Sequence, residues 1–165
     1  MNRKQITEKL TEQLEKHINP HNDPRIYTAK EVTFDYSTEH PIRVDYMVFK
    51  PINNSVGGIE KGVFYCYEIK SCKEDLLSGH GMNFIGDYNY LVFNKGMFDE
   101  LNNYVPYNVG VYELSNNCLT CVKKARLKIR ERSVTEMLLM MFRSSNRELL
   151  KIKRDSWRQT NEINK

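Results

Sequence analysis

Two carboxylates and a lysine stand in neighbouring stretches of the chain that are typical of β-strands. Asp45 lies within residues 43–49, and Glu68 and Lys70 lie within residues 63–70. Both stretches are short, rich in aromatic and β-branched residues, and bounded by turn residues. Side chains two apart on a strand share a face, so Glu68 and Lys70 project together while Ile69 turns into the core. At the ends of adjacent strands, these three side chains are able to hold a divalent metal ion beside an activated water. Such an arrangement cleaves phosphodiesters.

The ion expected at such a site is Mg²⁺ or Mn²⁺. Asp45 and Glu68 offer hard oxygen ligands, and the carbonyl of Ile69 is a candidate third ligand. We expect Lys70 to stay charged beside two carboxylates, which favours electrostatic stabilisation of the reacting phosphate over a role as general base. The alternative is an ordinary ion pair at a strand end.

Other acidic residues are candidates for a further metal or water contact. Glu31 precedes the strands that carry the trio, and Glu8, Glu12 and Glu15 follow i, i+4, i+7 spacing in the first predicted helix, so they share one helical face. For each of these residues the alternative is a glutamate that faces solvent.

Basic residues near the trio are candidates for phosphate contacts. Arg43 lies two residues before Asp45 on the same strand face, where it would grip a phosphate or neutralise Asp45. Lys73 follows the second strand. His80 stands between two glycines, as a phosphate contact, a proton donor or a loop histidine with neither role.

Positive charge is concentrated toward the C-terminus. The chain carries a net charge of +4, but residues 123–158 hold 12 Lys or Arg against 4 acidic residues. This segregation favours a polyanionic partner, and the alternative is a solvated basic face. The predicted phosphate-tracking residues are Lys123, Lys124, Arg126, Lys128, Arg130 and Arg132, with Arg147, Lys151 and Arg154 extending the track.

Four cysteines, Cys66, Cys72, Cys118 and Cys121, raise the question of a metal or disulfide. The CxxC formed by Cys118 and Cys121 lacks a second CxxC or a histidine pair that would complete a zinc site. Cys66 shares a strand face with Glu68. Unpaired buried thiols are the expected outcome in a cytosolic chain.

The pattern of apolar and turn residues predicts the order α-β-β-β-α-β-α-β-β-α. Helices are predicted over residues 4–17, 73–77 resuming at 82–86, 97–102, and from Ser133 with Val134, Leu138, Met141 and Phe142 on the apolar side. Strands are predicted over residues 25–36, 42–49, 63–70, 88–93, 109–114 and 119–123, with a turn-rich loop over residues 50–62.

This order indicates an α/β fold with a mixed sheet flanked by helices, in which residues 63–70 form the sheet centre. The 165 residues suit one domain, predicted over residues 1–152, followed by a polar tail over 153–165 that frays. The chain shows no apolar run long enough to span a membrane and no signal peptide, so a cytoplasmic protein is expected.

Asp45, the loop after it, and Glu68-Ile69-Lys70 resemble the PD-(D/E)XK nuclease signature, with Val44 in the place of its proline. A closer resemblance, over roughly residues 31–147, is to the MmcB-like DNA-repair endonucleases. It rests on the stretches 31–34, 43–45, 67–71, 73–77, 87–93, 105–106 and 109–111. The chain departs from that family at residues 79–82, where the family has a Lys-Trp pair in a continuous helix.

The resemblance implies a restriction-endonuclease-like core, αβββαβ, extended here by a C-terminal hairpin and helix. It also implies a metal-dependent endonuclease that cuts DNA in repair, recombination or defence, in a bacterium or phage. The choice of DNA over RNA rests on this resemblance alone. A homodimer would suit a double-strand cut. The alternative is an adaptor that binds nucleic acid or protein and keeps the fold without catalysis.

Overall fold

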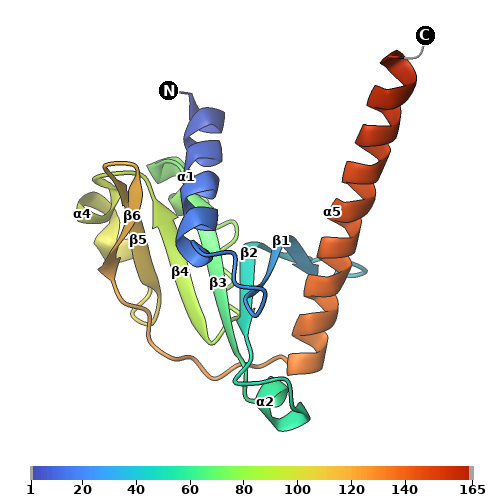
Figure 1. Ribbon diagram of the computed structural model, residues 1–165. Coiled ribbons are helices and arrows are strands. Elements are labelled where there is room, and N and C mark those ends of the chain that lie inside the picture. The colour runs from blue at the N-terminus through green and yellow to red at the C-terminus, as the bar shows by residue number, and fades with distance from the viewer. Residues whose placement is uncertain (1, 164–165) are drawn as a thin grey trace.

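The computed structural model describes residues 2–163 and the side chains of residues 2–158. The strands form one sheet, and helices flank it (Figure 1). In order they are α1 (Arg3–Ile18), β1 (Tyr27–Phe34), β2 (Ile42–Lys50), α2 (Val56–Glu60), β3 (Val63–Lys70), α3 (Lys73–Leu77), β4 (Tyr88–Phe93), α4 (Met97–Leu101), a 3₁₀ turn (Asn102–Tyr104), β5 (Gly110–Ser115), β6 (Cys118–Lys123) and α5 (Val134–Ile163).

The six strands form a mixed sheet in the order in which they occur in the chain, β1-β2-β3-β4-β5-β6. The pairs β1–β2, β2–β3 and β5–β6 are antiparallel, while β3–β4 and β4–β5 are parallel. Each parallel connection passes through a helix, as parallel pairing requires. The predicted mixed α/β sheet is therefore confirmed, with β3 in its interior.

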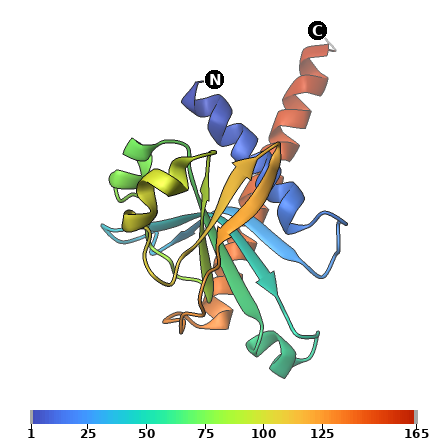
Figure 2. The same cartoon turned by 90° about the vertical axis from the view of Figure 1, so that its left-hand side faces the viewer.

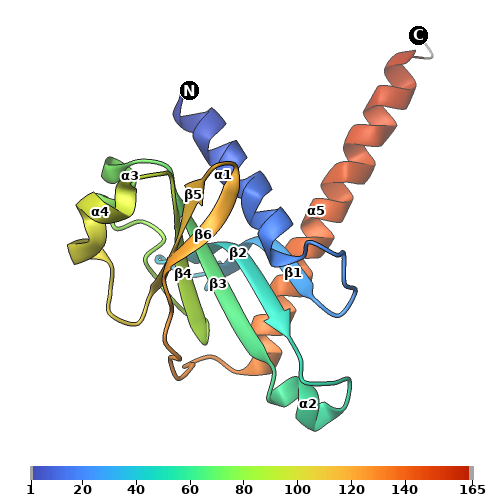
Figure 3. The ribbon, with the colours of Figure 1, turned by 60° about the vertical axis from the view of Figure 1, so that its left-hand side comes forward.

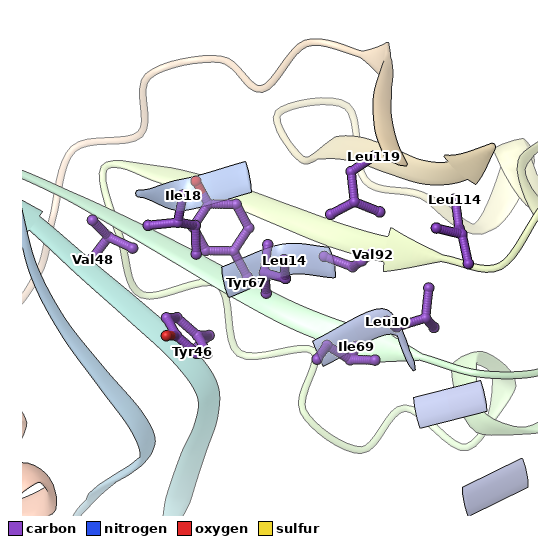
Figure 4. Packing of buried hydrophobic residues seen from close by; sticks show 10 residues of the cluster. All are labelled: Leu10, Leu14, Ile18, Tyr46, Val48, Tyr67, Ile69, Val92, Leu114 and Leu119. Carbon is purple, nitrogen blue, oxygen red and sulfur yellow. The ribbon is translucent and has the colours of Figure 1, made fainter. Parts of the chain in front are cut away.

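Helix α1 covers one face of the sheet (Figure 4). It begins with a capping box, in which Asn2 and Gln5 satisfy each other's backbone amides. Its buried residues Leu10, Leu14 and Ile18 recur every fourth position, as the sequence predicts, so they form one stripe. This stripe packs on a cluster from the sheet: Tyr46, Val48, Tyr67, Ile69, Val92, Leu114 and Leu119.

Helix α5 packs on the opposite side of the sheet, over β1, because its core cluster takes the alternate residues of the strands. Figure 2 shows both helices from a second direction. Met137 and Met141 of α5 are buried against a cluster that includes Phe34, Met47 and Phe64. The strands between the helices therefore alternate their side chains into two cores. Glu68 and Lys70 point to the face of β3 opposite Ile69, because strand side chains alternate.

Two predicted features of the helices are wrong in detail. Residues 50–62 contain the short helix α2, whose N-cap Ser55 accepts a hydrogen bond of 3.1 Å from the Gly58 amide. The helix predicted to resume at residues 82–86 is absent, because Gly79 (φ +72°), Gly81 (φ +74°) and Phe84 (φ +48°) adopt left-handed backbone conformations that interrupt a helix.

The predicted ending of the chain also differs from the structure. Helix α5 continues through Ile163, so the boundary predicted at residue 152 falls inside a helix, and residues 164–165 lie outside the described residues. The Lys, Arg and Glu content that favoured a frayed tail is equally compatible with a helix. Phe142 is 70% exposed, because Met137, Met141 and Ser144 define the sheet-facing side of α5 and Phe142 points away from it.

Candidate active site

Strands β2 and β3 stop pairing at the position of Asp45. Their last paired residues in this direction are Tyr46 and Tyr67. Beyond this pair the Asp45 side chain makes the next contact between the two strands: its Oδ2 accepts a hydrogen bond of 3.0 Å from the Ile69 amide. A carboxylate thus replaces a backbone carbonyl in the ladder, and Asp45 is held beside the end of β3 next to Glu68.

The pairing of β1 with β2 is interrupted at the same level. Lys30 pairs with Tyr46 and Val32 pairs with Val44, but Glu31 between them adopts a left-handed φ of +48° and is not paired. Helix α5 holds this irregular backbone. Ser144 donates a hydrogen bond to the Lys30 carbonyl, and Arg147 donates one of 2.9 Å to the Glu31 carbonyl.

Glu68 and Lys70 form a buried hydrogen-bonded pair under the loop that follows α3. The exposed fractions of the residues are 8% and 2%, and Lys70 Nζ lies 3.2 Å from Glu68 Oε1. Lys70 also donates a hydrogen bond to the carbonyl of His80. Gly81 packs directly on the Glu68 carboxylate, because a Cβ at this position would lie 1.6 Å from Oε1. The loop therefore covers the pair.

Asp45, Glu68 and Lys70 line one pocket of about 970 Å³. Residues of both α1 and α5 line this pocket, and Figure 3 shows the two helices diverging from the sheet. Its remaining lining residues come from five parts of the chain: Arg3, Thr7 and Thr11 of α1, Lys30, Glu31 and Thr33 of β1, Pro41, Arg43, Tyr46 and Ile69 around the strand ends, Asp75, Gly79, His80, Gly81 and Asn83 in and after α3, and Glu148 and Lys151 of α5.

Burial and mutual repulsion favour the neutral forms of both carboxylates. Burial raises the pKa of Glu68 to about 8, and the neighbouring charge of Asp45 adds to the shift while Lys70 opposes it. Burial also raises the pKa of Asp45, against the hydrogen bond from Ile69 and the charges of Arg43 and Lys70. A cation between the two carboxylates would relieve this penalty.

The donor set fits a hard divalent cation in part. Asp45 and Glu68 supply carboxylate oxygens close enough to raise the pKa of Glu68, and Ile69 lines the same pocket. Within residues 2–158, however, no group of three or more His, Cys, Asp or Glu side chains gathers into a metal cluster. Two carboxylates with backbone and water oxygens are thus the ligands that the described residues offer.

Only some of the predicted accessory residues meet at the pocket. Arg43, Glu31 and His80 line it, whereas Lys73 is exposed and is not among the lining residues. The glutamates of α1 also lie outside it. Each is close to a lysine: Glu8 to Lys4, Glu12 to Lys16 and Glu15 to Lys30. The pocket side of α1 carries Arg3, Thr7 and Thr11 instead.

The basic segment after β6 lies at the other end of the strands, and none of its residues lines the pocket. Lys123 donates to the Pro106 carbonyl and Lys128 to the Phe84 carbonyl. Arg130 forms an ion pair of 2.7 Å with the buried Asp87, just before β4. Among the predicted track residues, Lys123, Lys128 and Arg130 therefore serve intramolecular contacts.

Several pocket residues escaped the sequence analysis. Asp75 forms an ion pair of 2.9 Å with Arg3, and its charge acts on Asp45. The spacing Arg3, Thr7, Thr11 was a usable signal, since i, i+4, i+8 residues share a helical face. Lys30 shows no comparable signal in the sequence, because its position at the pocket depends on the pairing of β1 with β2.

The four cysteines are not joined in disulfides, and of the four only Cys66 is buried. Cys66 packs in the core between the sheet and α5, where burial raises the pKa of its thiol. Cys118 and Cys121 are exposed on the edge strand β6. Among the described residues no helix is long and apolar enough to cross a membrane.

Fold and site together define an α/β chain with a six-stranded mixed sheet and a pocket built on two carboxylates and a lysine. No protein-family model matches this chain, and neither does any curated protein. Among solved structures, a protein of unknown function from Silicibacter pomeroyi is similar, with a TM-score of 0.62 and 18% sequence identity over 91% of this chain and 92% of that chain. The likeness concerns the fold alone.

Proposed function

We propose that the chain is a metal-dependent nuclease of the PD-(D/E)XK type, with a restriction-endonuclease-like core, that hydrolyses phosphodiester bonds in DNA. The observation that carries this proposal is the convergence of Asp45, Glu68 and Lys70 in one pocket, at the point where β2 and β3 stop pairing. The resemblance to MmcB-like endonucleases, which rests on these residues, supports the same conclusion.

Asp45, Glu68 and the backbone of Ile69 would hold Mg²⁺ or Mn²⁺. When bound, such an ion supplies Lewis-acid activation of water and of the scissile phosphate. The Ile69 amide fixes the orientation of Asp45, and Gly81 allows the loop to approach Glu68 closely. Lys70 stabilises negative charge on the phosphate once its contact with the His80 carbonyl is released.

The pocket also carries cations for a phosphate ester. Arg3 of α1, Lys30 of β1 and Arg43 of β2 line its walls. Of these, Arg43 is exposed and lies two residues from Asp45, so it is placed to bind a phosphate next to the scissile one.

Cleavage of labelled single-stranded, duplex and branched DNA with Mg²⁺ or Mn²⁺ tests the proposal. We expect Glu68→Ala and Lys70→Ala to reduce cleavage on the order of 10²–10³-fold or more while DNA binding persists. Glu8→Gln, an exposed acidic position of α1 outside the pocket, is the matched control and should cleave like wild type. Circular dichroism confirms that each variant is folded.

Binding of DNA without cleavage by either metal would contradict the nuclease and favour the adaptor. The burial of Lys70 and its contact with the His80 carbonyl favour the adaptor, because the amine is already bonded within the protein. Titration with Mn²⁺, followed by calorimetry on wild type and Asp45→Asn, separates metal binding from catalysis.

A further inference from the structure

Helix α5 extends well past the sheet that holds its first half. After the buried Ser144, every described side chain of α5 through Arg158 is exposed except the half-buried Glu148. Figure 1 shows this part rising beyond the strands and diverging from α1. At 1.5 Å per residue, residues 145–163 extend for about 28 Å.

Five cations follow one side of this helix, and we call them the α5 row: Arg143, Arg147, Lys151, Arg154 and Arg158. The spacing of Arg143, Arg147 and Lys151 is i, i+4, i+8, and Arg154 and Arg158 continue it at i+3 and i+7 from Lys151, so the five share a helical face. Between residues 143 and 158 the acidic residues are Glu148 and Asp155. The side is therefore strongly positive.

The α5 row leads into the pocket. Lys151 lines it, and Arg147 holds the carbonyl of Glu31, which also lines it. Arg143 lies with its guanidinium 4.0 Å from the ring centroid of Tyr36, a tyrosine that is 59% exposed in the β1–β2 turn. Lys30 and Arg43 continue the positive charge on the pocket side. The row thus adjoins the turn and the pocket, whose lining carries both cations and carboxylates.

We propose that the α5 row binds the backbone of a single-stranded polynucleotide and guides it to the pocket. Neutralising successive phosphates releases counterions, which is the main source of affinity for such ligands. An exposed aromatic ring beside a cationic groove is the combination that single-strand binding surfaces use. This inference takes its substrate from the proposed nuclease function.

A single strand fits this surface better than a duplex does. Glu68 and Lys70 are less than a tenth exposed and lie between two helices. A flexible strand is able to thread between α1 and α5 to reach them, whereas a duplex is stiff. DNA and RNA single strands share the phosphate chemistry that the row recognises, and the experiment separates them.

The test is the affinity for labelled single strands, measured by fluorescence anisotropy with EDTA present so that no cleavage occurs. The variant is the triple substitution Lys151→Gln, Arg154→Gln and Arg158→Gln, all exposed and outside the catalytic trio. The matched control removes the same charge from exposed positions outside the pocket and the predicted phosphate track, by Lys50→Gln, Lys61→Gln and Lys95→Gln. DNA, RNA and duplex probes of the same sequence are compared.

We expect the α5 triple variant to bind single strands about tenfold or more weakly at low salt, with the slope of log K against log salt reduced by about 2. The control should change affinity less than about threefold. Equal losses in both variants, an unchanged salt slope, or tighter binding of duplex than of single strand would overturn the inference. The DNA and RNA arms show whether the sugar contributes.

These results are independent of the nuclease test. If wild type binds through the α5 row but never cleaves, the nuclease fails and the row stands. If wild type cleaves and the triple variant binds and cleaves equally well, the row fails and the nuclease stands.

Discussion

The side chain of Asp45 hydrogen-bonds the backbone amide of Ile69 at 3.0 Å, one residue beyond the last pair of the β2–β3 ladder. One carboxylate oxygen thus completes the sheet, and the rest of the group faces the pocket with Glu68. Asp45 therefore has a structural role and a proposed metal-binding role, and mutation can separate the two.

Asp45→Asn should keep the protein folded but abolish cleavage. The asparagine carbonyl still accepts the Ile69 amide, so we expect a change in unfolding free energy below about 1 kcal/mol, whereas Asp45→Ala leaves a part-buried amide unsatisfied and costs about 1–3 kcal/mol. Urea denaturation measures both. An asparagine variant as unstable as the alanine variant would show that the hydrogen bond is not what stabilises this end of the sheet.

Gly81 and Gly79 form a matched pair for testing how tightly the loop covers Glu68. Both have a left-handed φ, of +74° and +72°, so alanine strains the backbone similarly, by about 1–2 kcal/mol. Only at Gly81 does the added Cβ meet the Glu68 carboxylate.

We therefore expect Gly81→Ala to be less stable than Gly79→Ala by a further 1 kcal/mol or more, about the cost of overpacking. It should also lose nuclease activity, while Gly79→Ala retains it. Thermal unfolding and the cleavage assay give both readouts. Indistinguishable variants would mean that the loop does not rest on Glu68 in solution.

The raised pKa of Glu68, about 8, makes the stability of the metal-free protein depend on pH. Between about pH 4.5 and 8 the folded protein keeps the proton that the unfolded chain loses. Unfolding then releases a proton, so the unfolding free energy falls as pH rises, by up to about 1.4 kcal/mol per pH unit.

Glu68→Gln cannot titrate at this position, and its stability should vary less between pH 5 and 8. The substitution also weakens the contact with Lys70, but this changes the unfolding free energy by the same amount at every pH. It therefore does not affect the slope of unfolding free energy against pH, which is what is compared. Urea denaturation in EDTA across this range measures it. Parallel curves for the two proteins would show that Glu68 is ionised like an exposed glutamate.

Asp87 and Arg130 should matter for stability and not for the pocket chemistry. Asp87 accepts the Phe64 amide at 2.8 Å and pairs with Arg130 at 2.7 Å, and both side chains are largely buried. Asp87→Ala leaves Arg130 uncompensated, so we expect a loss of about 3–5 kcal/mol.

Arg126→Gln is the comparison within the same basic segment. Arg126 is exposed and stacks on Tyr107 at 4.0 Å, so its loss should cost about 1 kcal/mol or less. Denaturation curves for both variants test the difference. A small effect of Asp87→Ala would mean that the ion pair with Asp87 does not hold Arg130 in place, and that Arg130 is available to bind a ligand.

The amino-acid sequence by itself determined the strands and helices and the members of the candidate trio. Leu10, Leu14 and Ile18 give one apolar stripe at helical spacing, and the alternation in residues 63–70 separates Glu68 and Lys70 from Ile69. These features follow from local periodicity, which a short window contains in full. The short helix α2 and the left-handed residues were missed where glycine, asparagine or loop length left several conformations open.

Only the tertiary structure decided which charges face the pocket. Sequence analysis placed the phosphate track on residues 123–132 and extended it to Arg147, Lys151 and Arg154. The fold turns Lys128 and Arg130 inward, keeps Lys151 at the pocket, and adds Arg3 of α1 and Lys30 of β1, which the sequence analysis did not include. The function of a charged side chain depends on which residue lies opposite it. That partner is set by contacts between residues far apart in the chain, such as Arg147 with Glu31 or Arg3 with Asp75, and not by local pattern.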